Sequence, residues 1–301
     1  MIKKWALIML ILAVALVSLF GCGDTDSNSK TDVGKETALS ITSEQKDLKI
    51  TVKGDGVKGE ELVLTLEELA SIPDVGFDHI YSTINNWPTS RFYAANGIKV
   101  HSILEAAGVL ETAKVITFRS TDSYEMSFTR EQLLEGTQYY YPGVEEGIED
   151  GAEEVVPIIA YNYKEGSKDI SEAVPEALCL IIGQKSPIEH TNPAFVENIS
   201  EIIVSNQEPE AWEPATTFPA AGAIAAGETV KLQHPEMGII KLHYTLDGTE
   251  PTELSPMYNP STYQPELNKP IPITEDTVIK VLVSGYGKKN SEVATFAFKV
   301  Q

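Results

Sequence analysis

Hydrophobic and polar residues follow two different patterns along this chain. Between residues 39 and 204, alternating or continuous apolar runs predict the strands Leu48–Val52, Val115–Phe118, Ala177–Ile182 and Ile199–Val204. Thr65 and Glu68 form a capping-box pattern that predicts a short helix from Thr65 onward. Two further helical stretches are expected at Val100–Ala107, which ends at Gly108, and at Thr129–Leu134. This mixture predicts a domain of mixed α/β type over residues 39–204.

From residue 216 onward the pattern changes to short strands between turns, with no helical stretch. The expected strands are Gly227–Leu232, Lys241–Leu246, Thr277–Val283 and Ala294–Val300. The dipeptide Asp247-Gly248 follows one of these runs directly, which is a strong turn signal. Residues 216–301 are therefore expected to form an all-β sandwich. Residues 205–215, rich in proline and glutamate, are expected to link the two domains.

The amino terminus has the layout of an export signal over residues 1–21, with Lys3-Lys4 before an apolar run. That run holds roughly 16 residues, fewer than the ~20 that span a bilayer. The sequence Leu19-Phe20-Gly21-Cys22 resembles the lipobox of bacterial lipoproteins. The resemblance implies a lipid on Cys22 and an extracytoplasmic, membrane-anchored protein. Residues 22–38, which carry this cysteine and a polar stretch, are expected to be a flexible linker.

The formal net charge of −21 narrows the choice of partners. Removing residues 1–21 would remove two lysines and no acid, which leaves about −23. Such acidity argues against nucleic acid, whose binding depends on Lys and Arg. It also argues against electrostatic attraction to anionic lipid, so the bilayer is expected to be contacted through the lipid alone. The acidic segment Glu145–Asp150 lacks the spacing of a calcium loop and is expected to be a solvated loop.

Four segments of the second domain resemble the chitobiase/β-hexosaminidase C-terminal domain. They are Tyr244–Thr252, Ser255–Tyr258, Ile273–Lys280 and Ser291–Thr295. The resemblance implies an immunoglobulin-like sandwich, common as an accessory module in bacterial surface proteins. It does not imply hydrolysis, because the catalytic domain of those enzymes is a separate barrel with no counterpart here. Asp247, Gly248 and Pro251 are assigned to turns.

The first domain resembles the molybdopterin-binding domain of the sulfite oxidase family. The similar segments, in the family's order, are Leu64–Leu69, Asn96–Val100, Ile103–Val109, Ser120–Tyr124, Ile158–Tyr161 and Ala177–Gly183. The resemblance extends from Leu48 to Val204 and implies that family's α+β fold.

The residues for the family's metal chemistry are missing. The family's molybdenum-ligating cysteine would lie near Tyr81–Asn86, which reads YSTINN here. Apart from Cys22, the one cysteine is Cys179, whose apolar surroundings predict a core residue. Val174–Cys179 replaces the family's basic phosphate-holding stretch. No cofactor is therefore expected, with molybdopterin kept as a possibility.

The candidate ligand-binding residues are assigned to the mouth of the former cofactor pocket. The segment Ile80–Arg91 is interpreted as a loop there, and it supplies Asn85, Asn86, Trp87 and Arg91. The family resemblance implies that Asp122 and Tyr124 face the same region. The alternative is that Trp87 fills the vacated pocket and the amides bind loop backbone. His101 and the cluster Tyr139–Pro142 are expected to be packing residues.

Three functions remain open. The first is a lipoprotein whose molybdopterin-type domain binds a small ligand or partner without redox chemistry. The second is a molybdenum oxidoreductase with atypical ligation, for example by Ser82. The third is a cell-surface polysaccharide-binding protein. Because the chain carries no GxSxG, HExxH, P-loop or CxxC motif, no other catalytic class is indicated.

Overall fold

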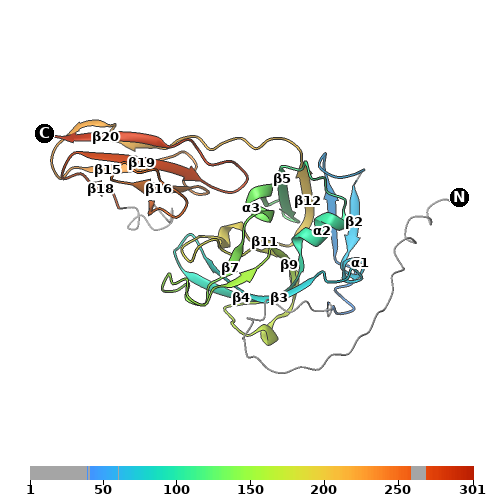
Figure 1. Cartoon of the computed structure of the whole chain (residues 1–301). Coiled ribbons are helices and arrows are strands. Elements are labelled where there is room, and N and C mark those ends of the chain that lie inside the picture. The colour runs from blue at the N-terminus through green and yellow to red at the C-terminus, as the bar shows by residue number, and fades with distance from the viewer. Residues whose placement is uncertain (1–38, 40, 60, 259–268) are drawn as a thin grey trace, which may run out of the picture. The chain divides into compact units, whose positions relative to one another are not determined.

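The computed structural model describes residues 39, 41–59, 61–258 and 269–301. The described part is mostly β-sheet, with three short α-helices (Figure 1). All of it belongs to one compact unit, Val33–Gln301. The predicted signal, the lipidation site Cys22 and the linker to residue 38 lie outside the described residues. No described helix is long and apolar enough to cross a membrane.

A five-stranded antiparallel sheet forms the centre of residues 39–205, which we call the amino-terminal lobe. Its strands, in spatial order, are β11 (Val196–Glu197), β10 (Val174–Ile181), β9 (Ile158–Glu165), β4 (Ser90–Lys99) and β3 (Gly76–Ile84). Along β9, Ile159 and Tyr161 pack into one hydrophobic core while Ile158 and Ala160 pack into a second. Because both faces are buried, the strands have continuous apolar runs rather than a simple alternation. The predicted buried strand at Ala177–Ile182 is confirmed.

A second sheet packs against the first core. Its order is β2 (Leu62–Thr65), β1 (Lys49–Lys53), β12 (Ile199–Ser205), β5 (Val115–Ser120) and β6 (Glu125–Thr129), with β1 and β12 parallel. On the opposite side of the central sheet, the short pair β7 (Gln138–Tyr140) and β8 (Glu153–Val155) joins the second core. Tyr140 and Tyr141 are buried there, which confirms the packing role expected for this aromatic cluster.

The three helices begin and end close to where the sequence predicts. They are α1 (Leu66–Ala70), α2 (Val100–Ala106) and α3 (Arg130–Leu134), and two 3-10 turns follow at Ile170–Glu172 and Asn192–Ala194. Thr65 accepts a hydrogen bond from the Glu68 N–H and the Glu68 carboxylate accepts one from the Thr65 N–H, which confirms the capping box. Gly108, at φ +68°, follows α2 in the left-handed conformation that glycine adopts readily.

The remaining strands form the carboxy-terminal lobe, residues 206–301. A three-stranded sheet has the order β13 (Thr216–Phe218), β15 (Thr229–Gln233) and β18 (Ile271–Pro272). The five-stranded sheet has the order β14 (Gly222–Ile224), β20 (Ala294–Val300), β19 (Thr277–Ser284), β16 (Lys241–Thr245) and β17 (Met257–Tyr258). The two sheets enclose one core, consistent with an immunoglobulin-like sandwich, and the described part of this lobe contains no helix.

The loop between β19 and β20 of the carboxy-terminal lobe contacts the amino-terminal lobe. The Gln132 side chain of α3 donates to the Gly285 and Lys288 carbonyls (2.8 and 3.0 Å) and accepts from the Gly287 N–H (2.9 Å). Tyr286 packs against Phe128, with ring centroids 5.0 Å apart. Hydrogen bonds and apolar contacts therefore both hold the lobes together.

Candidate functional site

The interpretation of Ile80–Arg91 as a loop is correct only for residues 85–89, because the rest of the segment belongs to strands. It is divided between β3 and β4, which pair from Gly76 to Ile98, and only residues 85–89 connect them. Asn85 Oδ1 accepts from the Trp87 and Thr89 N–H groups (2.8 and 3.1 Å), which shapes this turn. The Trp87 side chain is 52 % exposed and so does not fill a pocket.

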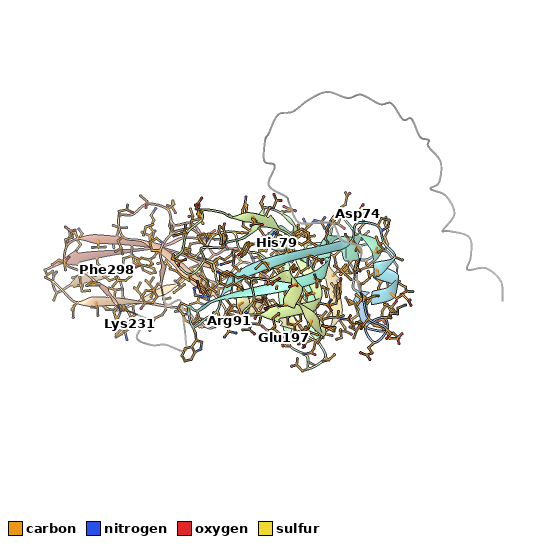
Figure 2. All side chains as sticks on the ribbon, turned by 90° about the horizontal axis from the view of Figure 1, so that it is seen from below. Asp74, His79, Arg91, Glu197, Lys231 and Phe298 are labelled. Carbon is orange, nitrogen blue, oxygen red and sulfur yellow. The ribbon has the colours of Figure 1, made fainter. Side chains whose placement is uncertain are left out.

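Two other candidate residues serve local structure. Arg91, labelled in Figure 2, lies on β4 and forms an ion pair with Glu165. Asp122 is exposed and accepts hydrogen bonds from the Ser120 hydroxyl and the Tyr124 N–H, and these bonds lower its pKa. His101, expected to be packed, is exposed on α2 because it points away from the core that Val100 and Ile103 enter.

The position expected for a metal ligand holds two buried hydrogen-bonded pairs, Ser82 with Gln184 and Thr83 with Thr191, which together we call the β3 polar cluster. All four residues are fully buried. The Ser82 hydroxyl donates to Gln184 Oε1 (2.6 Å) and accepts from the Tyr141 N–H (2.8 Å). The Thr83 and Thr191 hydroxyls are 2.7 Å apart and bond each other. Ser82 therefore has both a donor and an acceptor partner already, and is poorly placed to ligate molybdenum.

Cys179 is a core residue, as its surroundings predict. It lies on β10 at 1 % exposure, and its thiol donates to the Leu180 carbonyl (3.5 Å). Burial raises the pKa of the thiol well above its ordinary value, so the metal-binding thiolate is disfavoured. Among the described residues, no group of three or more His, Cys, Asp or Glu side chains is placed to hold a metal ion. The residues present thus do not fit the molybdenum centre of molybdopterin enzymes.

A cavity of about 700 Å³ opens between the two lobes, and we call it the interlobe cavity. The amino-terminal lobe lines it with residues of the β3–β4 loop, of β6 and of the segment between 185 and 193. The carboxy-terminal lobe lines it with β16, the segment around Leu254 and the β19–β20 loop. Asn86 and Tyr124 are the two candidate ligand residues among its lining residues. The acidic loop at Glu145–Asp150 is exposed, as expected, and does not belong to it.

Lys241 is the central charged residue of this cavity. Its ammonium donates to Asn86 Oδ1 (2.9 Å), and no carboxylate of the described residues lies within 4.0 Å of it. Burial lowers the pKa of Lys241 to about 8, since removal from water disfavours the charged form. At neutral pH this residue is therefore mainly a cation without a matching anion.

Two histidines lie close to Lys241. His190 is 7 % exposed, and burial followed by the Lys241 charge lowers its pKa to about 3. Its Nδ1 is buried and finds no hydrogen-bond partner in the described part of the chain. His243 bonds the Ser255 carbonyl through Nδ1 (3.2 Å) and the Ser284 hydroxyl through Nε2 (3.1 Å). His190 alone of the two therefore keeps hydrogen-bonding capacity for a bound molecule.

The cavity's acidic residues have partners of their own. Glu189 accepts from the Tyr286 hydroxyl (3.2 Å) and from the Lys185 N–H, and burial raises its pKa. Glu253 accepts from the Asn290 side-chain amide (2.7 Å). These carboxylates are engaged locally, which leaves the Lys241 charge uncompensated.

Sequence reasoning missed Lys241, His190 and Glu189. One usable signal was present in β16, where Lys241 and His243 are two residues apart and must share a face of the strand. Leu242, between them, enters the core from the opposite face. The partner residues come from distant segments, so their meeting is not visible in local sequence.

Comparisons with known proteins give one family match. Residues 219–295 match the family described as "Chitobiase/beta-hexosaminidase C-terminal domain". The carboxy-terminal lobe is therefore similar to that domain, in agreement with the resemblance inferred from its turns. No curated protein matches the chain.

Two solved structures show weak similarity. The sulfane dehydrogenase SoxCD from Paracoccus pantotrophus is 11% identical, with 84% of this chain and 70% of that chain covered and a TM-score of 0.33. The glycoside hydrolase domain of Endo-D from Streptococcus pneumoniae R6 is 14% identical, with 74% and 33% covered and a TM-score of 0.21.

Proposed function

We propose that this protein is an extracytoplasmic bacterial lipoprotein that binds a small molecule in the interlobe cavity without redox chemistry. In this proposal, residues 39–204 keep a sulfite oxidase-like, molybdopterin-binding type of fold that no longer serves a metal. The observation that carries the proposal is the uncompensated Lys241 cation in a cavity of about 700 Å³. Ligand sites commonly have volumes of about 300–1,000 Å³, with few polar groups among apolar walls.

The state of the hydrogen bonds supports this choice of site. Buried polar groups are normally satisfied, and an unsatisfied one calls for an explanation. His190 Nδ1 is such a group, and its residue lines the cavity together with Lys241. A bound molecule would supply the missing partners.

The molybdenum alternative fits these residues less well. Molybdenum would need a ligand that replaces the family's cysteine, and Ser82 already has two hydrogen-bond partners. Production in a host that makes molybdenum cofactor, followed by metal and pterin analysis, tests this directly. Near-stoichiometric molybdenum with extractable pterin would overturn the non-redox proposal.

The polysaccharide alternative rests on the accessory role of the chitobiase-type family. A pull-down on insoluble glycans separates it from small-molecule binding. If the protein is retained on a glycan, and a substitution that blocks the cavity does not reduce this retention, the polysaccharide alternative is favoured.

Gly238 offers a way to block the cavity. It lines the cavity, and a Cβ added there meets no atom within 4 Å. Because the Cβ position is open, Gly238→Trp should direct an indole toward the cavity, and Gly238→Ala is the matched control. Val33–Gln301 holds all the described cores and strands as one compact unit and is suitable for the assay.

The test is a thermal-shift screen of small metabolites against the wild type and both variants. We expect compounds that raise the melting temperature of the wild type and of Gly238→Ala but not of Gly238→Trp. Compounds that stabilise all three equally would place the binding site elsewhere and overturn the proposal.

Membrane anchoring is tested separately on the full chain. Labelled palmitate should be incorporated into the wild type in a bacterial host and lost in Cys22→Ser, because the cysteine sulfur would carry the lipid. Equal labelling of both proteins would contradict the lipoprotein assignment.

A further inference from the structure

The rim of the interlobe cavity gathers exposed apolar side chains. Tyr124, Ile188, Ile239 and Leu254 all line the cavity, and their exposed fractions are 47, 43, 61 and 68 %. Single exposed apolar residues are common on protein surfaces, whereas several around one cavity indicate a contact surface. The rim therefore suits an apolar part of a ligand.

The polar end of the cavity suits one negative charge. Lys241 is a half-buried cation that donates to a neutral amide at Asn86 and has no described carboxylate partner. A cation that has lost part of its hydration gains from an anion placed beside it. A phosphate group would ordinarily require several cationic or N–H donors, whereas a carboxylate needs fewer.

We propose that the ligand of this cavity is an organic carboxylate with an apolar body. Its carboxylate contacts the Lys241 ammonium, and its apolar body lies against Ile188, Ile239 and Leu254. This inference rests on the proposed function, since it names the chemical class of the molecule bound there. His190, which lines the same cavity, has a buried Nδ1 without a described hydrogen-bond partner, and this is a second observation at the polar end.

The neighbours of Lys241 set the electrostatics of such a complex. The titratable groups that line the same cavity are His190, His243, Lys185, Glu125, Glu189, Glu253, Tyr124 and Tyr286. Both histidines are neutral near pH 7, because burial lowers their pKa values. The acidic net charge of the chain acts over longer distances and is largely screened at physiological salt, where the Debye length is about 8 Å.

The test is isothermal titration of Val33–Gln301 with three probes that share one apolar body: octanoate, 1-octanol and octylammonium. Octanoate should bind at least about tenfold more tightly than either other probe, since only it pairs with Lys241. Acetate, which has the charge without the apolar body, should bind too weakly to measure.

Substitutions at Lys241 assign the effect to this residue. Lys241→Met should weaken octanoate binding by about tenfold or more, and Lys241→Arg should retain binding. Lys231→Met is the control, because Lys231 is an exposed lysine of β15 that does not line the cavity (Figure 2). Lys231→Met should leave octanoate affinity unchanged.

The pH dependence provides a second readout. With a Lys241 pKa of about 8 in the free protein, octanoate affinity should be constant near neutral pH and fall above pH 8. Lys241→Arg should remove this fall, because arginine stays charged.

The outcomes separate this inference from the proposed function. If octanol or octylammonium binds as tightly as octanoate, and Gly238→Trp abolishes this binding, the carboxylate class is overturned and the cavity remains the ligand site. If neither Lys241→Met nor Gly238→Trp changes octanoate affinity, both the inference and the proposed site are overturned. If none of the alkyl probes binds, while Gly238→Trp still prevents stabilisation by compounds from the metabolite screen, only the inference is overturned.

Discussion

The β3 polar cluster and the polar end of the interlobe cavity both contain polar side chains that are at least partly buried, yet they differ in hydrogen bonding. In the cluster, Ser82 has two partners, and Thr83 bonds Thr191. In the cavity, Lys241 lacks a described carboxylate partner and His190 Nδ1 has no described partner at all. Satisfied buried polar groups stabilise a fold, whereas unsatisfied ones cost free energy and persist where a ligand can repay them. We therefore expect the β3 polar cluster to stabilise the fold and the interlobe cavity to bind a ligand.

The largest expected effect is on the cluster. Ser82→Ala removes one partner each from Gln184 Oε1 and the Tyr141 N–H in a dry core. We expect the free energy of unfolding to fall by about 2–3 kcal/mol, measured by urea denaturation. Ser71→Ala is the control, because Ser71 is exposed and its hydroxyl donates to the Glu68 carbonyl at the surface. A loss no greater than that of the control would show that the cluster is not structural.

The connection between the lobes comes next. Gln132→Glu keeps the shape of the side chain but replaces the amide that donates to the Gly285 and Lys288 carbonyls. Repulsion between the carboxylate and these carbonyls should lower the free energy of unfolding by about 1–2 kcal/mol. Hydrogen exchange should rise in the β19–β20 loop. The control is Glu131→Gln, the reverse exchange at an exposed neighbouring residue, which should change neither the free energy of unfolding nor hydrogen exchange in the loop. Equal effects of Gln132→Glu and Glu131→Gln would contradict the assigned contacts.

A smaller effect concerns the pH dependence of stability. The folded-state pKa of Lys241, about 8, lies below the ordinary value of 10.5, so the unfolded chain binds more protons between these values. The stability of the wild type relative to Lys241→Met should therefore rise from pH 8 to pH 10, by up to about 1 kcal/mol per pH unit. The difference between the wild type and Lys231→Met should stay flat over this range. A flat difference for Lys241→Met as well would mean that the folded chain does not bury this ammonium.

The smallest effect is expected at Cys179. Cys179→Ala should reduce stability by about 0.5–1 kcal/mol and leave octanoate affinity unchanged. In the fragment Val33–Gln301, which has no other cysteine, the native thiol should react with a thiol reagent only after unfolding. Rapid labelling of the native fragment would contradict a buried thiol.

Local sequence patterns predicted several elements of the fold well. The capping box at Thr65 and Glu68 formed as expected, because its hydrogen bonds join neighbouring residues. The strand β20 has the bounds that its alternating pattern predicts. In such elements the chain's own neighbours supply the decisive contacts.

The β3–β4 hairpin was missed because both of its faces are buried. Its sequence from Gly76 to Ile84 mixes apolar residues with His79, Ser82 and Thr83, which do not alternate as in a half-exposed strand. The polar members are satisfied by residues about a hundred positions away, such as Gln184. No local pattern carries that information.

The candidate site was predicted only in part. Asn86 and Tyr124 line the cavity, whereas the other candidates serve turns or an ion pair. The cavity depends on how the β19–β20 loop packs on α3, a long-range contact that sequence spacing does not encode. Lys241 resembles any strand lysine until that packing is known.

The most direct test of the central claim compares octanoate affinity in Ser82→Ala, Gly238→Trp and Gly238→Ala by isothermal titration. The account predicts that Gly238→Trp loses about tenfold or more in affinity while the other two variants bind like the wild type. Undiminished binding by Gly238→Trp, together with a loss in folded Ser82→Ala, would contradict it and place the site at the β3 polar cluster.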